Sequence, residues 1–428
     1  MSIIDELLSD QILPDMVRVK QKFPAPQVEP ASLPALVRSR CDEAGLGALI
    51  KPGQRLALAC GSRGIANLAL ITGALVDYIQ KHGGSPFVVP AMGSHGGATA
   101  EGQAAVLESL GLTENLIGCP IVSSMETDLL AHAPDGRRIY LDRQALGADG
   151  IIVINRIKPH TSFRGPFESG LMKMLVIGLG KQKGAEACHE SGFSYLAEDL
   201  AAFGRIIIRE AKVIGGLGIM ENAYDQTMKI DFWPAGRIME MEPVFLREAK
   251  LNMPRLMFEE VDVLVVDRLG KEISGDGMDP NITGRYACAT GDDGTGLKPN
   301  RLVALDLTDE THGCALGLGV ADIVTKRLFD KLDLDATYAN GITCQDLDGA
   351  KIPMIAANDR QAIKIALKTG RPFRRQAPRV IRISDTLHLS EIYISSGLLN
   401  DAMSHNDIEI LSGAEPLIFD AKNNLFHT

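Results

Sequence analysis

Three side chains able to bind an acid or move a proton each follow an apolar stretch of the chain. Arg63 stands in GSRG after RLALAC, His95 in GSHGG after PFVVPAM, and His160 in KPHT after GIIVIN. Imidazole titrates near neutral pH, so it can take up and return a proton, and guanidinium pairs with a carboxylate through two parallel hydrogen bonds. A single loop histidine is more often a solvated bystander, but the shared position of all three indicates a site for a small acid.

A lysine, Lys173, stands inside the apolar run LMKMLVIG, thirteen residues after His160 and sixteen before His189. Burying an unpaired ammonium is costly, so either the stem lies along the core with its head in water or a partner meets the charge there. His189 falls in a predicted helix, GAEACHES, with no second histidine at i+3 or i+4. The sequence by itself therefore does not support a metal site built from protein side chains alone.

Strands and helices alternate around these loops. We predict strands at 55–60, 86–92 and 150–155, and helices near 33–44, over 68–81 and after an N-cap at Thr99. This order is typical of right-handed βαβ units and a largely parallel sheet, whose ligand crevice is lined by loops at the carboxyl ends of the strands. We therefore expect the three loops to share one edge of a sheet.

A second α/β series begins near residue 258. It contains predicted strands at 261–267 and 301–307 and predicted helices at 319–332 and 360–368. We therefore predict an α/β fold of two domains with mainly parallel sheets and a cleft between them. Residues 1–255 would form the first domain, which carries the three loops and therefore the catalytic site, opening with an irregular lead-in to about residue 50. Residues 256–428 would close over the cleft, and 397–428 could pack on either domain.

Composition excludes several classes of protein. With 428 residues, 45% apolar and 23% charged, the chain is typical of a folded soluble protein. A net charge of −10 without basic runs argues against nucleic acid as a partner. The first residues lack a basic signal-like segment, and no apolar stretch approaches eighteen residues, so we expect no membrane segment. Seven scattered cysteines without CxxC fit reduced thiols and a cytoplasmic location.

The segment MLVIGLGKQKG (174–184) permits a rival interpretation. An apolar run followed by three glycines imitates a dinucleotide fingerprint, but the spacing to the last glycine is one residue too long. The acid expected about twenty residues later is not evident, since Glu198 and Asp199 fall in a predicted helix. An NAD(P)-dependent dehydrogenase of a small hydroxy acid stays an alternative, as does a non-catalytic protein that binds a cofactor or solute.

The residues set out above resemble those of the nickel-dependent lactate racemase family, whose members use a nickel-pincer nucleotide. GSHGGATAEGQ (93–103) is similar to the family's glycine-flanked histidine after an early strand. His160 and Lys173 match, in order, a second histidine, a loop and a lysine, and the spacing from Lys173 to His189 is the most specific agreement. Arg63 occupies the place of the family's carboxylate-binding arginine. The resemblance covers most of the first predicted domain and is faint in the second.

The resemblance implies a racemase or epimerase of a 2-hydroxy acid that works by transient hydride transfer to the nickel-pincer nucleotide, a pyridinium bisthiocarboxylate mononucleotide with nickel. It implies that Lys173 holds this cofactor, covalently in some members, and that His189 ligates the nickel. His95 and His160 would be paired acid/bases on opposite faces of the substrate carbon, and Arg63 would anchor the carboxylate. Cofactor-synthesis enzymes would be partners, and a homo-oligomer is compatible with the pattern.

Two segments depart from the family pattern. The 161–172 loop is a few residues longer and contains Arg164 and Glu168, so it could carry another recognition group. In the second domain the family's lysine has no clear counterpart, and the candidates for substrate binding are Lys271, Asn281 and Arg285. We therefore expect a larger or more polar 2-hydroxy acid than lactate, such as a sugar acid. Which hydroxy acid it is, and whether the cofactor is covalently attached to Lys173, stay open at this point.

Overall fold

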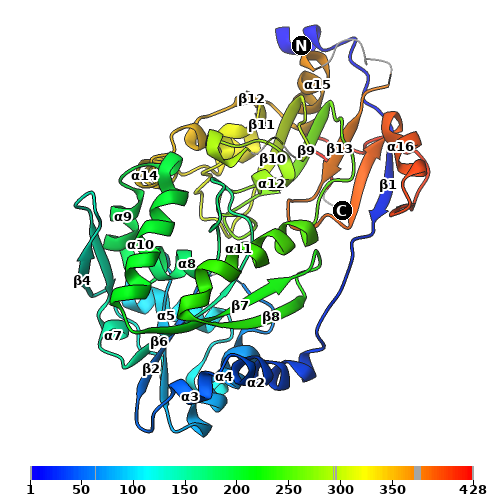
Figure 1. Ribbon diagram of the computed structural model, residues 1–428. Coiled ribbons are helices and arrows are strands. Elements are labelled where there is room, and N and C mark those ends of the chain that lie inside the picture. The colour runs from blue at the N-terminus through cyan, green and yellow to red at the C-terminus, as the bar shows by residue number, and fades with distance from the viewer. Residues whose placement is uncertain (1, 63, 293, 295, 371–376, 427–428) are drawn as a thin grey trace. The chain divides into compact units, whose positions relative to one another are not determined.

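The computed structural model describes residues 2–62, 64–292, 294, 296–370 and 377–426. The chain divides into two compact units (Figure 1). The N-terminal unit comprises Pro24–His160 and Arg164–Met253. The C-terminal unit comprises Met1–Phe23, Thr161–Phe163 and Pro254–Thr428. Each contains a mixed sheet that is mainly parallel and is packed with helices, so the predicted fold class of two α/β domains is confirmed.

The N-terminal unit is built on a five-stranded sheet of order β3-β2-β6-β7-β8. The strands are β2 (Arg55–Cys60), β3 (Ser85–Pro90), β6 (Gly150–Arg156), β7 (Val213–Glu221) and β8 (Thr227–Pro234). The first four are parallel and β8 is antiparallel to β7. β2, β3 and β6 are almost entirely buried apolar runs, as expected for parallel strands covered on both faces. All three strands predicted in this region are present.

Helices cover both faces of this sheet (Figure 1). The helices of the unit are α2 (Leu33–Glu43), α3 (Leu46–Leu49), α4 (Leu68–Lys81), α5 (Ala100–Ser109), α6 (Glu114–Ile117), α7 (Arg143–Leu146), α8 (Leu171–Lys173), α9 (Lys181–His189), α10 (Leu196–Glu210) and α11 (Ala235–Asn252). Buried Val37 of α2 and Leu75 of α4 join Leu58 and Ile152 of the sheet in one core. As predicted, Thr99 is the N-cap of α5, and its side chain accepts a hydrogen bond from the Gly102 N–H.

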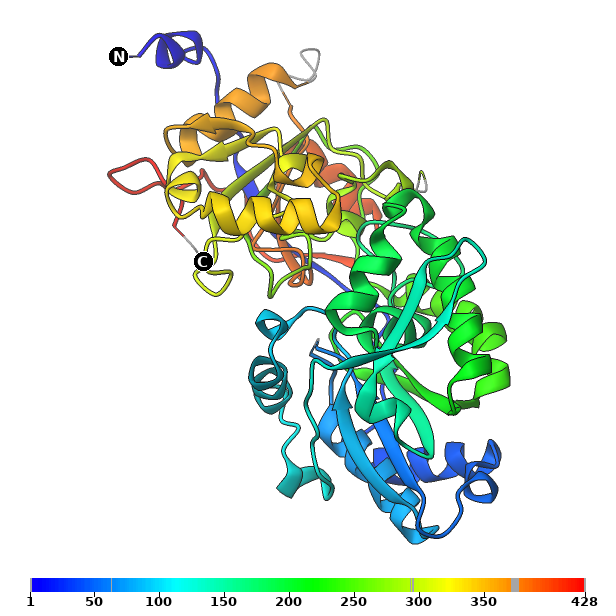
Figure 2. The same cartoon turned by 90° about the vertical axis from the view of Figure 1, so that its left-hand side faces the viewer.

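A two-stranded hairpin of β4 (Thr127–His132) and β5 (Arg138–Asp142) completes the N-terminal unit. In Figure 2 this teal hairpin lies against the green helices α9 and α10. Between α8 and α9 the chain continues as a π-helical turn, Met174–Gly178. The apolar run before the glycines is thus helical, whereas a dinucleotide fingerprint requires a strand there. The dinucleotide-fingerprint interpretation of 174–184 is therefore wrong.

The C-terminal unit contains an eight-stranded sheet of order β12-β11-β10-β9-β13-β14-β1-β15. The strands are β1 (Met16–Gln21), β9 (Val263–Leu269), β10 (Arg301–Leu307), β11 (Ile323–Thr325), β12 (Met354–Ala356), β13 (Val380–Ile383), β14 (Glu391–Ser395) and β15 (Ile408–Ile410). β12 through β13 are parallel, and β14, β1 and β15 continue the sheet antiparallel. The helices are α1 (Ile3–Leu7), α12 (Pro280–Thr283), α13 (Lys326–Asp330), α14 (Leu334–Cys344), α15 (Asp359–Thr369) and α16 (Leu399–Ser404).

The C-terminal unit differs in extent from the predicted second domain. Residues 1–23, which we assigned to the first domain, cluster with the C-terminal unit because β1 pairs with β14 on one side and β15 on the other. Residues 397–428 cluster in the same unit.

The predicted helix over 319–332 is present only in its second part. Ile323–Thr325 forms β11, and α13 begins only at Lys326. The run Ile-Val-Thr is β-branched and pairs with β10, and the Thr325 hydroxyl accepts from the Leu328 N–H as the N-cap of α13. The strand therefore ends at the residue that starts the helix. Across the described residues, none of the helices combines the length and hydropathy needed to cross a membrane.

Candidate active site

The candidate site begins at one edge of the N-terminal sheet. β2 pairs in parallel with β3 on one side and β6 on the other, so the carboxyl ends of these three strands lie together. Ser62 follows β2, His95 follows β3 and His160 follows β6. The parallel pairing of β2 with β3 and β6 therefore brings the loops after these strands to one edge of the sheet, as predicted. Arg63, which follows Ser62, lies outside the described residues.

The segment between Lys173 and His189 packs against two of these loops. A Cβ on Gly61 would lie 2.9 Å from Asn155 Oδ1 and 3.2 Å from Met174 Sδ. The N–H of Gly93 donates to the Gly178 carbonyl at 3.1 Å, so the loop of His95 is tied to the end of the π-helical turn. The structure therefore brings the loops after β2 and β3 onto the segment that carries the lysine.

His95 stands on a loop of left-handed residues. Gly93, Gly96, Gly97 and Ala98 all have φ between 53° and 66°. Glycine is required at Gly96, because a Cβ there would come within 2.6 Å of the backbone at residue 102. The His95 side chain is exposed, and its Nδ1 lies 2.5 Å from the Ser62 hydroxyl oxygen. This contact orients the ring, a role for which Ser62 carried no signal in the sequence beyond its place after β2.

His160 is held at both of its backbone polar groups by the 161–172 loop. Its N–H donates to Glu168 Oε2 at 2.8 Å, and its carbonyl accepts from Arg164 Nη1 at 2.6 Å. Glu168 is fully buried and also accepts from Lys250 Nζ of α11 at 2.7 Å. The charged residues of this longer loop thus clamp the histidine backbone, whereas the sequence had suggested a recognition role for them.

Lys173 finds a partner in His160. Its Nζ lies 2.7 Å from Nε2 of His160, and both side chains are half-buried. Burial, and next to it the positive charge of Lys173, lower the pKa of His160 well below its ordinary value. The imidazole is therefore neutral at physiological pH and accepts a hydrogen bond from the ammonium through the lone pair on Nε2.

His189 is the last residue of α9, as the predicted helix required. Its Nδ1 bonds the Ala185 carbonyl at 2.7 Å, and its ring meets Phe193 edge-on at 5.7 Å between centroids. Burial lowers the pKa of His189, and the charge of Lys173 lowers it further against the effect of the carbonyl. Because Nδ1 donates to that carbonyl, the lone pair of this neutral ring is on Nε2, which is the tautomer that metal-binding histidines adopt.

A buried carboxyl group, Glu242 of α11, lies at the start of the lysine-bearing helix. Its Oε2 accepts from the Met172 N–H at 2.9 Å, and burial raises its pKa to about 8. Glu242 is therefore neutral at pH 7 and anchors the turn that presents Lys173. The sequence reasoning missed Glu242, since nothing local distinguishes a glutamate seventy residues away in a helix.

The three substrate candidates of the second domain lie in the C-terminal unit. Arg285 Nη2 donates to the carbonyls of Pro299 and Asn300 at 2.9 Å and lies 3.1 Å from Asp322 Oδ2. Asn281 donates through Nδ2 to Asp279 at 2.8 Å. The backbone N–H of Lys271 donates to the Thr311 hydroxyl at 3.3 Å. The Arg285 contacts link the 268–285 loop to the residues that lead into β10 and β11.

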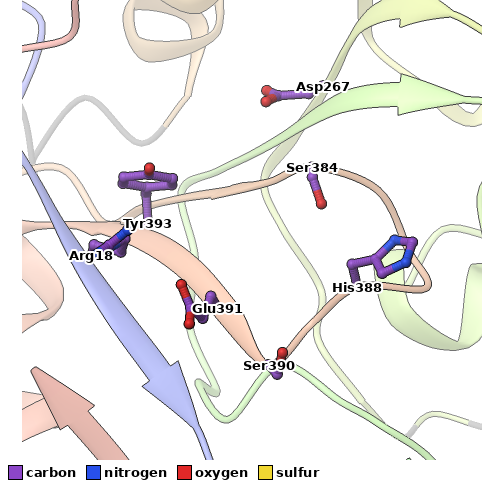
Figure 3. Close-up of a pocket in the computed structure, with 7 residues that line it drawn as sticks. All are labelled: Arg18, Asp267, Ser384, His388, Ser390, Glu391 and Tyr393. Atoms are coloured by element: carbon purple, nitrogen blue, oxygen red, sulfur yellow. The ribbon is translucent and has the colours of Figure 1, made fainter. Parts of the chain in front are cut away.

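A pocket of about 280 Å³ also lies in the C-terminal unit (Figure 3). It is lined by Arg18, Asp267, Ser384, His388, Ser390, Glu391 and Tyr393. Both oxygens of its buried Asp267 are taken by Arg382 at 2.8 Å. Among the residues that the structure describes, none of the predicted site residues lines this pocket.

Comparison with known proteins identifies solved structures of similar fold. No protein-family model matches the chain, and neither does any curated protein. A solved structure of the lactate racemase apoprotein from Thermoanaerobacterium thermosaccharolyticum superposes with a TM-score of 0.52 at 12% identity, covering 88% of this chain and 99% of that one. The chain has a lactate racemase-like fold. A crystal structure of a Thermotoga maritima protein, also 12% identical, covers 66% of this chain and 71% of its own with a TM-score of 0.46.

Proposed function

We propose that this protein is a racemase or epimerase of a 2-hydroxy acid that works with a nickel-pincer nucleotide. The observation that carries the proposal is the pairing of Lys173 with His160 at 2.7 Å, in a lactate racemase-like fold. A dehydrogenase would need neither this pair nor a second histidine near the same lysine.

The residues present fit such a cofactor. Lys173 offers a half-buried amine at the end of α8. His189 is a neutral imidazole whose Nδ1 is tied to a backbone carbonyl, which leaves Nε2 as a nitrogen donor suited to nickel. We propose that Lys173 holds the nucleotide and that His189 ligates its metal. The chemistry that the group supplies when bound is reversible acceptance of a hydride from the substrate carbon.

The proton chemistry is assigned to His95 and His160. For one enantiomer, one histidine takes the hydroxyl proton and the other supplies a proton on the opposite face of the substrate carbon. For the other enantiomer the two roles are exchanged. His160 suits the role of base because its lowered pKa keeps it neutral, and the clamp of Arg164 and Glu168 holds its backbone in place. His95 is oriented by Ser62. Arg63 is the proposed carboxylate anchor.

The proposed substrate is a 2-hydroxy acid larger or more polar than lactate, such as a sugar acid. Lys271, Asn281 and Arg285 stay the proposed contacts from the C-terminal unit. We also propose a cytoplasmic location and the cofactor-synthesis enzymes as partners, with a homo-oligomer as the proposed assembly.

The test uses protein made beside the cofactor-synthesis enzymes and single enantiomers of a panel of 2-hydroxy acids. His95→Ala and His160→Ala should each lose interconversion in both directions by about a hundredfold or more, as for a positioned acid/base. His132→Ala removes an exposed histidine of the same unit and should retain wild-type rates. Interconversion near the wild-type rate in either active-site variant would show that the two-histidine mechanism is wrong.

Nickel content tests the cofactor independently of turnover. His189→Ala should lose most of the nickel found in the wild type, because one donor to the metal is removed. His132→Ala should keep it. Full nickel occupancy in His189→Ala would show that His189 does not ligate the metal.

A further inference from the structure

A second lysine of the same segment, Lys181, is fully buried at the start of α9. Its backbone is left-handed, with φ of 53°, a conformation unusual for a side-chain-bearing residue. Its Nζ donates to the Pro90 carbonyl at 2.5 Å and to Gln103 Oε1 at 2.9 Å. It also lies 3.3 Å from Asp142 Oδ2. One ammonium thus joins the end of β3, helix α5 and the end of β5.

Burying the ion pair of Lys181 and Asp142 costs desolvation free energy. Asp142 is fully buried too, and its Oδ1 accepts from the Ala145 N–H at 2.9 Å. Burial lowers the pKa of Lys181 and raises the pKa of Asp142, so both charges are held at a cost of desolvation. An apolar residue of similar size would avoid that cost. The chain retains instead a group that can only donate hydrogen bonds.

The ammonium determines which way the Gln103 amide points. Gln103 is fully buried, and because its oxygen accepts from Lys181, its nitrogen must face the opposite side. That nitrogen donates to the Gly93 carbonyl at 2.8 Å and to the His95 carbonyl at 3.2 Å. These carbonyls belong to the left-handed loop that presents the His95 ring. A continuous series of hydrogen bonds therefore connects Lys181 through Gln103 to the backbone of His95.

We propose that Lys181 is a positioning residue that holds His95 in place through the side chain of Gln103. The proposal explains why the buried group is an ammonium: a second amide at this position could accept as well as donate, and the Gln103 amide could then turn over. Only the expected effect on kcat rests on the proposed function. The position of the His95 ring can be measured without turnover.

The test replaces Gln103 by an isosteric acceptor. Gln103→Glu keeps the volume and the contact with Lys181 but removes the donor to the two loop carbonyls. The matched control is Gln21→Glu in the C-terminal unit. Gln21 is also fully buried, donates through Nε2 to the carbonyls of Leu389 and Arg255, and accepts through Oε1 from the Met257 N–H. Both variants thus remove the same kind of donor.

The first measurement is the ring signal of His95 in carbon–proton NMR spectra of the full chain, assigned with His95→Ala, together with amide hydrogen exchange of residues 93–98. Gln103→Glu should shift or broaden the His95 signal and speed exchange in the loop by about tenfold or more, while Gln21→Glu should leave both unchanged. Lys181→Met should reproduce the effect where it folds. An unchanged His95 signal and unchanged loop exchange in Gln103→Glu would overturn the proposal.

The second measurement separates this proposal from the function itself. In protein loaded with cofactor, Gln103→Glu should lower kcat on the order of tenfold to a hundredfold with little change in KM, because a misplaced acid/base slows the reaction more than it weakens binding. If the His95 signal moves and kcat does not, the positioning role stands and the catalytic role of His95 is wrong. If kcat falls while the His95 signal and loop exchange stay unchanged, the positioning role is wrong.

Discussion

Nζ of Lys173 lies 2.7 Å from Nε2 of His160. A protonated lysine and a protonated imidazole cannot share a hydrogen bond, since neither would accept, so the contact requires a neutral His160. Burial and the adjacent ammonium both lower the pKa of His160 and favour that state. The pair therefore keeps the imidazole of His160 neutral.

Removing the lysine charge should therefore raise the pKa of His160. Lys173→Met keeps an unbranched apolar stem and removes the positive charge beside Nε2, so protonation of the ring becomes easier. The measurement is an NMR titration of the His160 ring signal in protein without cofactor, assigned with His160→Ala. Lys183→Met, which removes an exposed charge from α9, should leave this pKa nearly unchanged. An equal titration midpoint in Lys173→Met and wild type would contradict the pairing.

The clamp on the His160 backbone predicts that Glu168→Gln is costly. The variant removes the buried charge that pairs with Lys250 and accepts the His160 N–H, so we expect a loss of about 1–3 kcal/mol in the free energy of unfolding. Denaturant unfolding measures this loss. Glu248→Gln on α11 breaks a partly exposed ion pair with Lys229 of β8 and should cost about 1 kcal/mol or less. If the two variants lose the same free energy of unfolding, the buried contacts of Glu168 stabilise the fold no more than a partly exposed ion pair does.

Glu242 predicts a pH dependence of stability with a definite sign. Its pKa is about 8 in the folded protein against an ordinary 4.5, so between these values the folded chain binds a proton that the unfolded chain has released. Its contribution to stability is therefore full below pH 4.5 and is lost as pH rises toward 8, by up to about 1.4 kcal/mol per pH unit.

Glu242→Gln cannot titrate and removes this slope. The free energy of unfolding of the variant relative to wild type should rise steadily between about pH 5 and pH 8, as measured by urea unfolding at several pH values. Glu240→Gln, on the exposed side of the same helix, should show a flat difference. A flat difference for Glu242→Gln as well would mean that the carboxyl group ionises normally in the folded state.

The pairing of β1 predicts which unit a core variant near the N-terminus destabilises. Val19 is fully buried and pairs with both Ile392 and Ile410, so Val19→Ala should cost the C-terminal unit roughly 1–3 kcal/mol. The single tryptophan, Trp233, lies in β8 of the N-terminal unit and reports on that unit alone. Unfolding followed by circular dichroism should shift to lower urea while the Trp233 fluorescence transition stays in place. If the Trp233 fluorescence transition shifts by the same amount, Val19→Ala also destabilises the N-terminal unit, and the prediction is wrong.

Local patterns in the sequence determined the elements around the site. Apolar runs bounded by glycine gave β2, β3 and β6, and a threonine in front of an alanine-rich segment gave the start of α5, because strand burial and helix capping depend on neighbouring residues. The same reasoning failed over 319–332, where a short β-branched strand joins a helix without a glycine or proline between them. The positions of His95 and His160 after parallel strands followed from this local order.

Partners distant along the chain were decided only by the tertiary structure. The sequence marked Lys173 as a charge in need of a partner, but the choice of His160 depends on how the chain turns after β6. Glu242, the Lys181–Gln103 contact and the pairing of β1 with β14 join residues that no periodicity relates. Periodicity and capping report which face of an element is buried, whereas the identity of the group that meets a buried charge depends on contacts between elements, and those form only when the chain folds.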